Sequence, residues 1–176
     1  MKRVPLFEFS INRKNRTIQI QREFDADLEL VWQAWTSGPL LDRWCAPKPY
    51  RTETKSLDFR EGGHWHYAII SPEGKKHWSR YDYKKIEPGK SIVELRAFSD
   101  EHGRALPDFA PTECTLFFSQ GKDHALVTMT EKYSSPEMFE KMAMPSHKKG
   151  FSSHLKNLDG LLLTLKIEQN ETEFGI

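Results

Sequence analysis

Alternating apolar and polar positions recur through the first two thirds of the chain and predict β-strands. The first clear example runs from Thr17 to Phe24, where every second side chain is suited to a core. More strand patterns follow between Tyr50 and Tyr133, and most are separated by short turn-forming sequences. Because short connections favour antiparallel neighbours, we expect one antiparallel sheet of about seven strands. The later strands are predicted at Tyr50–Phe59, His64–Ile70, His77–Ile86, Ile92–Phe98, Thr112–Ser119 and Ala125–Tyr133.

Two short helices are predicted directly after the first strand. Asp27 can cap a helix whose apolar residues recur at helical spacing. This helix is expected to end at Ser37, Gly38 and Pro39. A second helix is expected from about Pro39 to Trp44, because proline is well tolerated in the first turn of a helix.

The C-terminal part of the chain predicts a long helix. Ser135 and Pro136 begin a short helical segment that Pro145 interrupts, and helical spacing resumes at about Ser146. The long helix carries one apolar stripe, which needs a buried partner, and a sheet face is the natural one. The stripe consists of Phe151, Leu155, Leu158, Leu162 and Leu165.

The order of these elements predicts an α+β fold in which the long helix lies across a single sheet. We expect residues 1–14 to form a loose N-terminal arm, residues 15–168 one domain, and residues 169–176 a frayed C-terminal tail. The longest connection, Ser99 to Pro111, contains Phe109, and apolar loops of this kind often cover an opening.

Composition and charge exclude several classes of partner. The formal net charge is +1, which provides no field for a nucleic acid or an anionic membrane. No apolar run has the length of a signal peptide or a membrane span, so a cytoplasmic location is expected. Cys45 and Cys114 are far apart and are expected to be free thiols.

The stretch "REGGHWHYAII" poses a choice between a metal site and a binding pocket. Side chains alternate across a strand, so His64 and His66 share one face while Trp65 and Tyr67 share the other. The bulkier apolar set should face the core, which leaves the histidines in solvent. Two imidazoles alone make a weak zinc site, so we expect no metal and no cofactor.

Several longer motifs resemble one protein family. The sequences "IQIQREFDADLELVWQAWTSGPLLDRWCAP", "LDFREGGHW", "ISPEG" and "KGFSSHLKNLDGLL" resemble the activator of heat shock protein 90 ATPase-like branch of the START-like (SRPBCC) superfamily. The likeness extends from about Arg16 to Lys166. It implies a helix-grip fold, in which a curved antiparallel sheet wraps around the C-terminal helix and usually leaves an internal cavity. The family commonly has a Trp-Trp pair before proline, whereas this chain has Trp44-Cys45-Ala46-Pro47.

The inward-facing rings and thioethers are the candidate ligand-binding residues. Core packing is the plain alternative for each of them, but buried Tyr and Trp side chains also carry polar groups that need partners. The expected cavity residues are Trp44, Trp65, Tyr67, Ile69, Tyr81, Tyr83, Phe98, Phe109, Phe118, Met129, Met142, Phe151 and Leu155.

Three functions remain open at this stage. The first is non-catalytic binding of a small hydrophobic or aromatic molecule, by a monomer or a homodimer. The second, implied by the resemblance alone, is a co-chaperone-like role toward a heat shock protein 90 type ATPase. The third is a cyclase-like or hydrolase-like enzyme, for which any inward-facing group of strand charges would form an acid/base or anion site. The charges considered are Glu53, Asp58, Arg60, Arg80 and Arg96.

Overall fold

The computed structural model describes residues 3–175 and contains one antiparallel sheet and four helices within them. The sheet has eight strands in the order β1-β2-β8-β7-β6-β5-β4-β3. The elements are β1 (Phe7–Asn12), β2 (Thr17–Phe24), α1 (Leu28–Thr36), α2 (Gly38–Trp44), β3 (Arg51–Leu57), β4 (His64–Ile70), β5 (Lys76–Glu87), β6 (Ser91–Ser99), β7 (Thr112–Gln120), β8 (Ala125–Tyr133), α3 (Pro136–Met142) and α4 (Pro145–Glu173).

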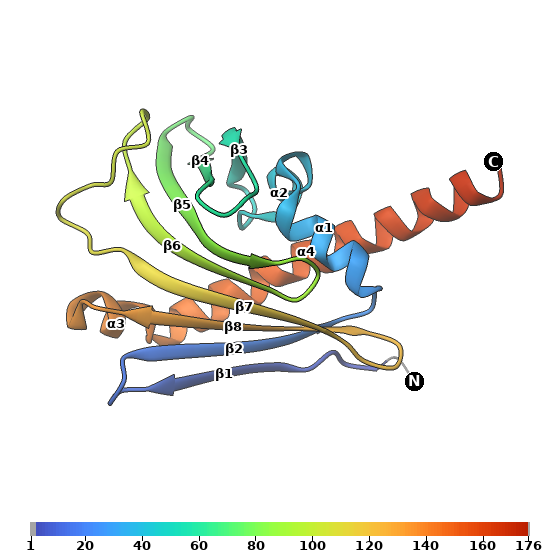
Figure 1. The fold of residues 1–176 in the computed structure, drawn as a ribbon, viewed down its shortest axis with the longest axis horizontal. Coiled ribbons are helices and arrows are strands. Elements are labelled where there is room, and N and C mark those ends of the chain that lie inside the picture. The colour runs from blue at the N-terminus through green and yellow to red at the C-terminus, as the bar shows by residue number, and fades with distance from the viewer. Residues whose placement is uncertain (1–2, 176) are drawn as a thin grey trace.

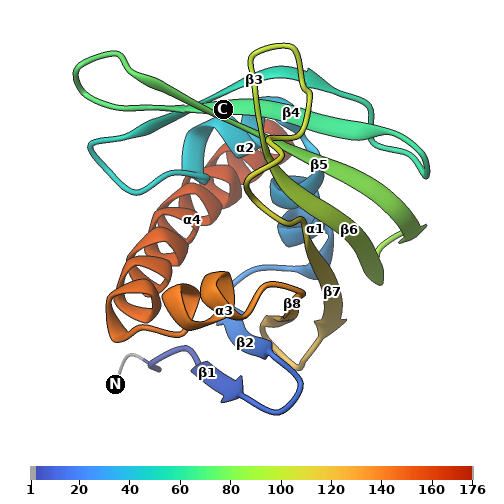
Figure 2. The ribbon, with the colours of Figure 1, turned by 90° about the vertical axis from the view of Figure 1, so that its left-hand side faces the viewer.

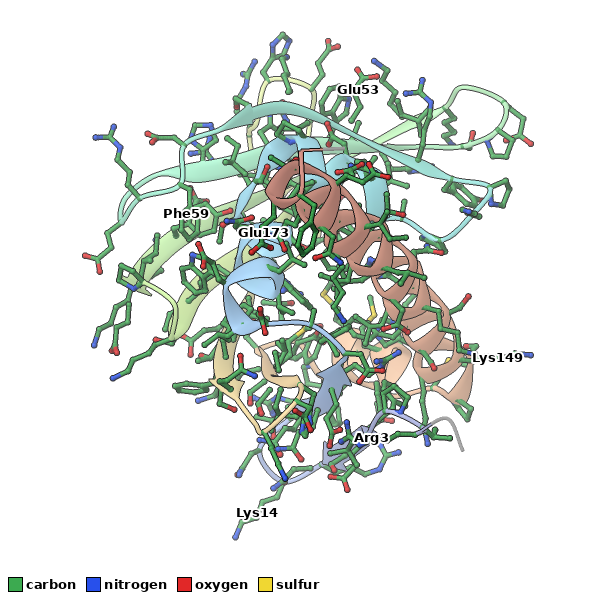
Figure 3. The ribbon with its side chains drawn as sticks, turned by 90° about the vertical axis from the view of Figure 1, so that its right-hand side faces the viewer. Arg3, Lys14, Glu53, Phe59, Lys149 and Glu173 are labelled. Carbon is green, nitrogen blue, oxygen red and sulfur yellow. The ribbon has the colours of Figure 1, made fainter. Side chains whose placement is uncertain are left out.

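The sheet curves around α4, as the helix-grip expectation required (Figures 1 and 2). β1 and β2 form one end of the curve and β3 to β5 form the other (Figure 2). Figure 3 shows α4 between these ends, with Glu53 on the β3 side and Arg3 and Lys14 on the β1 side. The long helix is therefore positioned to close the concave face of the sheet.

The main core lies between α4, the two helices after β2, and the concave sheet face. Leu155, Leu158 and Leu162 of α4 are buried, which confirms the predicted stripe. Val31 of α1 and Leu41 of α2 are buried in the same cluster. Full burial of one such aliphatic side chain stabilises the fold by about 1.5–3 kcal/mol, so this contact fixes the helix on the sheet.

The N-terminal arm was wrongly predicted to be loose, because residues 7–12 form the edge strand β1. β1 pairs with β2 from Phe7↔Arg22 to Asn12↔Thr17. The Phe9 ring also packs edge-on against His147 of α4, with 6.4 Å between the ring centroids. Strand pairing and this contact order the segment. Residues 1 and 2 lie outside the described part of the chain.

The predicted C-terminal tail is also different, because α4 continues as a regular helix to Glu173. In Figure 1 the last turns of α4 extend past the sheet. The side chain of Thr172 donates to the carbonyl of Glu168 at 3.0 Å, within the helix itself. Residues 169–173, which were expected to fray, therefore form the end of α4. Residue 176 lies outside the described part of the chain.

Both faces of β4 are covered, so the prediction that its two histidines lie in solvent is wrong for His66. Trp65 and Tyr67 face the interior and are 2% and 5% exposed, as expected. His66 points to the opposite face but is only 4% exposed, because the loop after β6 folds over it. Its Nε2 lies 3.1 Å from the carbonyl oxygen of Asp100. The first part of this loop, around Asp100, therefore covers the outer side of the sheet, a position that its apolar residues did not predict.

Within residues 3–175, no helix combines the length and hydropathy that spanning a bilayer requires.

Candidate functional site

A partly open cavity of about 250 Å³ lies between the concave sheet face, α3 and the first half of α4. A second, inner cavity of about 80 Å³ lies deeper, toward α1 and α2. The two share walls formed by five residues. These are Cys45, Tyr81, Arg96, Phe151 and His154.

Eleven of the thirteen predicted cavity residues lie on these walls, although ligand binding by any of them remains a prediction. The outer cavity is lined by Tyr67, Ile69, Tyr81, Phe98, Met142 and Phe151. The inner cavity is lined by Trp44, Trp65, Tyr81, Tyr83, Met129, Phe151 and Leu155.

The other two predicted residues, Phe109 and Phe118, lie away from both cavities. Phe118 is buried among the helix rings, with its centroid 5.0 Å from Trp32 and 5.6 Å from Trp35. Phe109 is 45% exposed and contacts the edge of Phe98 at 5.2 Å. Both side chains were assigned to the cavity from their apolar character. Phe118 instead packs against α1, and Phe109 lies in the exposed loop between β6 and β7.

The tryptophan rings of the inner cavity have satisfied indole nitrogens. Trp44 Nε1 donates to the carbonyl of Ala34 at 2.9 Å, and Trp65 Nε1 donates to Thr54 Oγ1 at 2.9 Å. Trp65 also stacks on Tyr67, with 3.9 Å between centroids. These contacts hold the rings as fixed walls, so the polar groups available to a ligand come from other residues.

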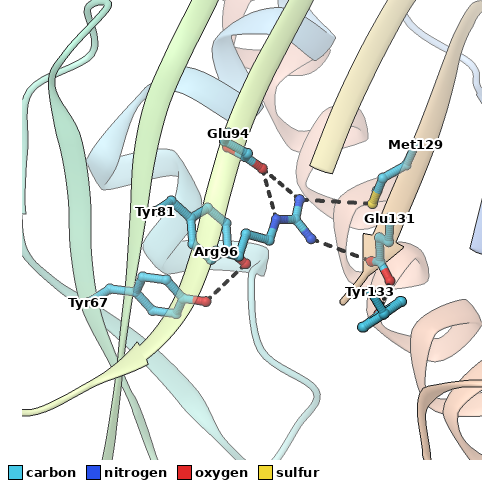
Figure 4. A network of polar contacts seen from close by, with 7 residues as sticks. All are labelled: Tyr67, Tyr81, Glu94, Arg96, Met129, Glu131 and Tyr133. Carbon is cyan, nitrogen blue, oxygen red and sulfur yellow. Dashed lines mark hydrogen bonds and ion pairs between the residues drawn. The ribbon is translucent and has the colours of Figure 1, made fainter. Parts of the chain in front are cut away.

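A buried ionic network lines the cavities, and sequence analysis named Arg96 but neither of the two carboxylates that pair with it (Figure 4). Arg96 donates to Glu94 Oε1 from Nε at 2.9 Å and from Nη2 at 2.7 Å. Its Nη1 lies 3.5 Å from Glu131 Oε1. Tyr133 donates its hydroxyl proton to the other oxygen of Glu131. The Tyr81 ring lies under the guanidinium, 4.6 Å from its carbon.

The network places two carboxylates against one cation in a poorly solvated position. The side chains of Glu94 and Glu131 are 4% and 6% exposed, and that of Arg96 is 18% exposed. Desolvation raises the pKa of Glu94 above its ordinary range, although the charge and hydrogen bonds of Arg96 oppose this. Glu94 is therefore a carboxyl group that can hold a proton more readily than one in water.

The remaining strand charges considered from the sequence do not join this network. Glu53 pairs with Arg51 at 3.2 Å, and Arg60 pairs with Asp58 at 2.7 Å, in exposed positions. Arg80 pairs with its strand neighbour Asp82 on the outer face of the sheet. Of the five charges, Arg96 alone lines the cavities, because its register places it beside Thr112 and Tyr81 on the inner face.

A group of hydroxyls lies beside this network, on the strands β4 and β5. Tyr67 donates to the hydroxyl oxygen of Tyr81 at 3.1 Å, and Ser79 lines the same cavity. Burial raises the pKa of the Tyr81 hydroxyl well above its usual value. The hydroxyls therefore stay protonated and can only donate or accept hydrogen bonds.

His154 and Cys45 complete the shared wall, and both are uncharged at neutral pH. Burial, with a smaller effect of the Arg96 charge, lowers the pKa of His154 to about 4. Its Nε2 is buried and has no hydrogen-bond partner within residues 3–175. Burial raises the pKa of the Cys45 thiol to about 12. The Ala46 carbonyl beside it accepts from Asn157 Nδ2 at 2.9 Å, which ties this corner to α4.

A metal centre is not supported by the described residues. No group of three or more His, Cys, Asp or Glu side chains in residues 3–175 is arranged to hold an ion. The His64 imidazole instead lies 3.0 Å from Ser56 Oγ at the sheet surface.

The fold is similar to several solved structures of low sequence identity. A protein from Arthrobacter aurescens superimposes with a TM-score of 0.81 at 24% identity, covering 89% of this chain and 91% of the other. Protein Ms6760 from Mycobacterium smegmatis gives 0.79 at 22% identity, covering 88% and 95%. The AHSA1 protein from Silicibacter pomeroyi gives 0.66 at 18% identity, covering 85% and 99%. At these identities the likeness concerns the fold.

The sequence itself matches one family model. The model described as "Activator of Hsp90 ATPase homolog 1-like protein" matches residues 25–163, which span α1 to the middle of α4. A search of curated proteins finds no match. The chain therefore belongs to the activator of Hsp90 ATPase homolog 1-like family, within the START-like superfamily that its motifs predict.

Proposed function

We propose that this protein binds a small, largely apolar or aromatic molecule in the cavity between the sheet and α4, without transforming it. The observation that carries the proposal is a partly open, mainly apolar cavity of about 250 Å³, half of whose lining residues carry aromatic rings or thioethers. Ligand sites typically combine such walls with a few polar groups that orient the guest. Glu131 and the Tyr67–Tyr81 pair supply those groups.

Energetics favour an occupied cavity. At about 24 cal/mol per Å³, an empty apolar void of this size would cost roughly 6 kcal/mol. This rivals the net stability of a domain, which is about 5–15 kcal/mol. Water can enter a partly open cavity, but water against rings such as Phe98 and Phe151 makes few hydrogen bonds. Replacing that water with an apolar guest is favourable.

The neutral dye N-phenyl-1-naphthylamine provides a direct test, because its fluorescence rises on transfer from water to an apolar site. We expect saturable binding to the wild-type protein. Ser79→Phe should weaken it at least tenfold, because Ser79 lies on the outer cavity wall beside Tyr67 and Phe98. Met142→Trp should fill the same space from α3.

Ser119→Phe is the matched control, since Ser119 is exposed near the end of β7. It should bind the dye like the wild type. Melting temperatures identify variants that fail to fold. The proposal is wrong if the dye does not bind, or if both filling variants fold and bind it as well as the control.

A role toward a chaperone ATPase is the second candidate, supported by the description of the matched family. If the protein acts in this way, it should raise the ATP hydrolysis rate of an Hsp90-type ATPase from the same organism and bind it in a pull-down. Absence of both effects at tens of micromolar protein would reject this role.

A further inference from the structure

We propose that the cavity selects aromatic amines, with a cationic or hydrogen-bond-donating end group, over aromatic carboxylates of the same size. This inference rests on the proposed binding function and names the class of guest. It runs against the simplest expectation for a cavity with an arginine on its wall, which would be capture of a carboxylate.

The guanidinium of Arg96 is already engaged by protein carboxylates. Nε and Nη2 converge on Glu94 Oε1, and Nη1 faces Glu131 Oε1. Nη2 also lies 4.0 Å from the sulfur of Met129, and the Tyr81 ring covers one face of the group. A ligand carboxylate would have to approach Arg96 beside two like charges, which is unfavourable at a site with little solvent.

The carboxylates, in contrast, keep capacity to accept. Glu94 Oε1 takes both bonds from Arg96, and no hydrogen bond within residues 3–175 engages its Oε2. Glu131 accepts from Arg96 and Tyr133, one bond to each oxygen. A carboxylate offers about four acceptor sites, so at least two remain on Glu131. Glu94 lines the inner cavity and Glu131 the outer one.

The charge of the cavity walls is therefore negative when both carboxylates are ionised. Arg96 is the permanent cation among the residues that line them, and His154 and Cys45 are uncharged at neutral pH. His147 lies at the first turn of α4, where its ring packs against Phe9 and Phe151. An ammonium group would bring the missing positive charge.

The aromatic walls favour the same guest. Rings present an electron-rich face, and a cation placed over such a face is attracted to it. Tyr81 already holds the Arg96 guanidinium in this way. Phe98, Phe151 and Tyr67 line the outer cavity, where the rest of an aromatic amine would lie.

Three indoles of nearly equal size test the inference in titration calorimetry at pH 8, where imidazoles are ordinarily neutral. Tryptamine carries a cation, 3-ethylindole carries no charge, and indole-3-acetate carries an anion. We expect tryptamine to bind at least tenfold tighter than 3-ethylindole, and 3-ethylindole to bind tighter than indole-3-acetate.

Variants locate the source of the preference. Glu131→Gln and Glu94→Gln each remove one charge with little change of shape, and each should reduce the ratio of tryptamine to 3-ethylindole affinity at least fivefold. Glu113→Gln is the control, because Glu113 is exposed on the outer face of β7, and it should leave the ratio unchanged.

The outcomes separate this inference from the function on which it rests. Equal affinities for the three indoles, tightest binding of indole-3-acetate, or a ratio unaffected in both folded Gln variants would overturn the inference. So would failure of all three indoles while N-phenyl-1-naphthylamine still binds, and in each of these cases the binding function stands. If neither the dye nor any indole binds, both proposals fall.

Discussion

Replacement of Arg96 by methionine should destabilise the protein by about 3–5 kcal/mol, because it leaves two buried carboxylates without their cation. Glu94 and Glu131 are almost fully buried and both face the Arg96 guanidinium. Each would then have to take up a proton or remain charged in a poorly solvated site. Urea unfolding at pH 7 measures the loss, which should shrink toward pH 5 as protonation becomes easier.

Two comparisons make this prediction specific. Arg51→Met removes a cation from an exposed pair with Glu53, so it should change the stability by less than about 1 kcal/mol. The triple variant Arg96→Met/Glu94→Gln/Glu131→Gln removes all three charges and should recover much of the loss. A similar effect of Arg96→Met and Arg51→Met would contradict the energetic role assigned to the network.

Acid should destabilise the wild-type protein through His154 over a defined pH range. Its pKa in the folded protein is about 4. The unfolded chain has the ordinary value of about 6.5 and therefore binds the proton first. The stabilising contribution of neutral His154 is complete above about pH 6.5 and is lost as the pH falls toward 4, by up to about 3 kcal/mol.

His154→Gln isolates this contribution, because it removes the titrating group while retaining a polar side chain. The difference in unfolding free energy between wild type and variant should change by about 3 kcal/mol between pH 7 and pH 4. His77→Gln, at an exposed position of β5, is the control and should follow the wild type. Parallel pH profiles for wild type and His154→Gln would refute the assignment.

Much of the fold could be predicted because its signals are local. The alternation in Thr17–Phe24 and the helical stripe through Leu155 and Leu158 each identify an element and its buried face. β1 was missed because its short alternation, Phe7 and Phe9, becomes meaningful only beside its partner β2. Strand pairing is a long-range property, and a short edge strand carries little of its own signal.

Many residues of the cavity walls could be predicted from the sequence, whereas the carboxylates of the ionic network were missed. Trp65 and Tyr67 could be assigned to the inner face because large aromatic side chains on a strand are usually buried. Glu94 and Glu131 occupy inward positions of β6 and β8, in the same period-two register as Ile92 and Met129. That register was the available signal. It was overlooked because buried carboxylates are rare unless paired, and their pairing with Arg96 depends on the order of the strands.

The central claim is that a guest enters the space between the sheet and α4, and methyl NMR tests it most directly. In protein labelled with ¹³C-methyl methionine, Met138 and Met142 report on the outer cavity and Met129 on the inner one, while Met144 is exposed. On titration with N-phenyl-1-naphthylamine, we expect shifts and intermolecular NOEs at Met138 and Met142 and none at Met144. Dye-induced changes confined to Met144, or dye binding without any change at Met138 and Met142, would contradict it.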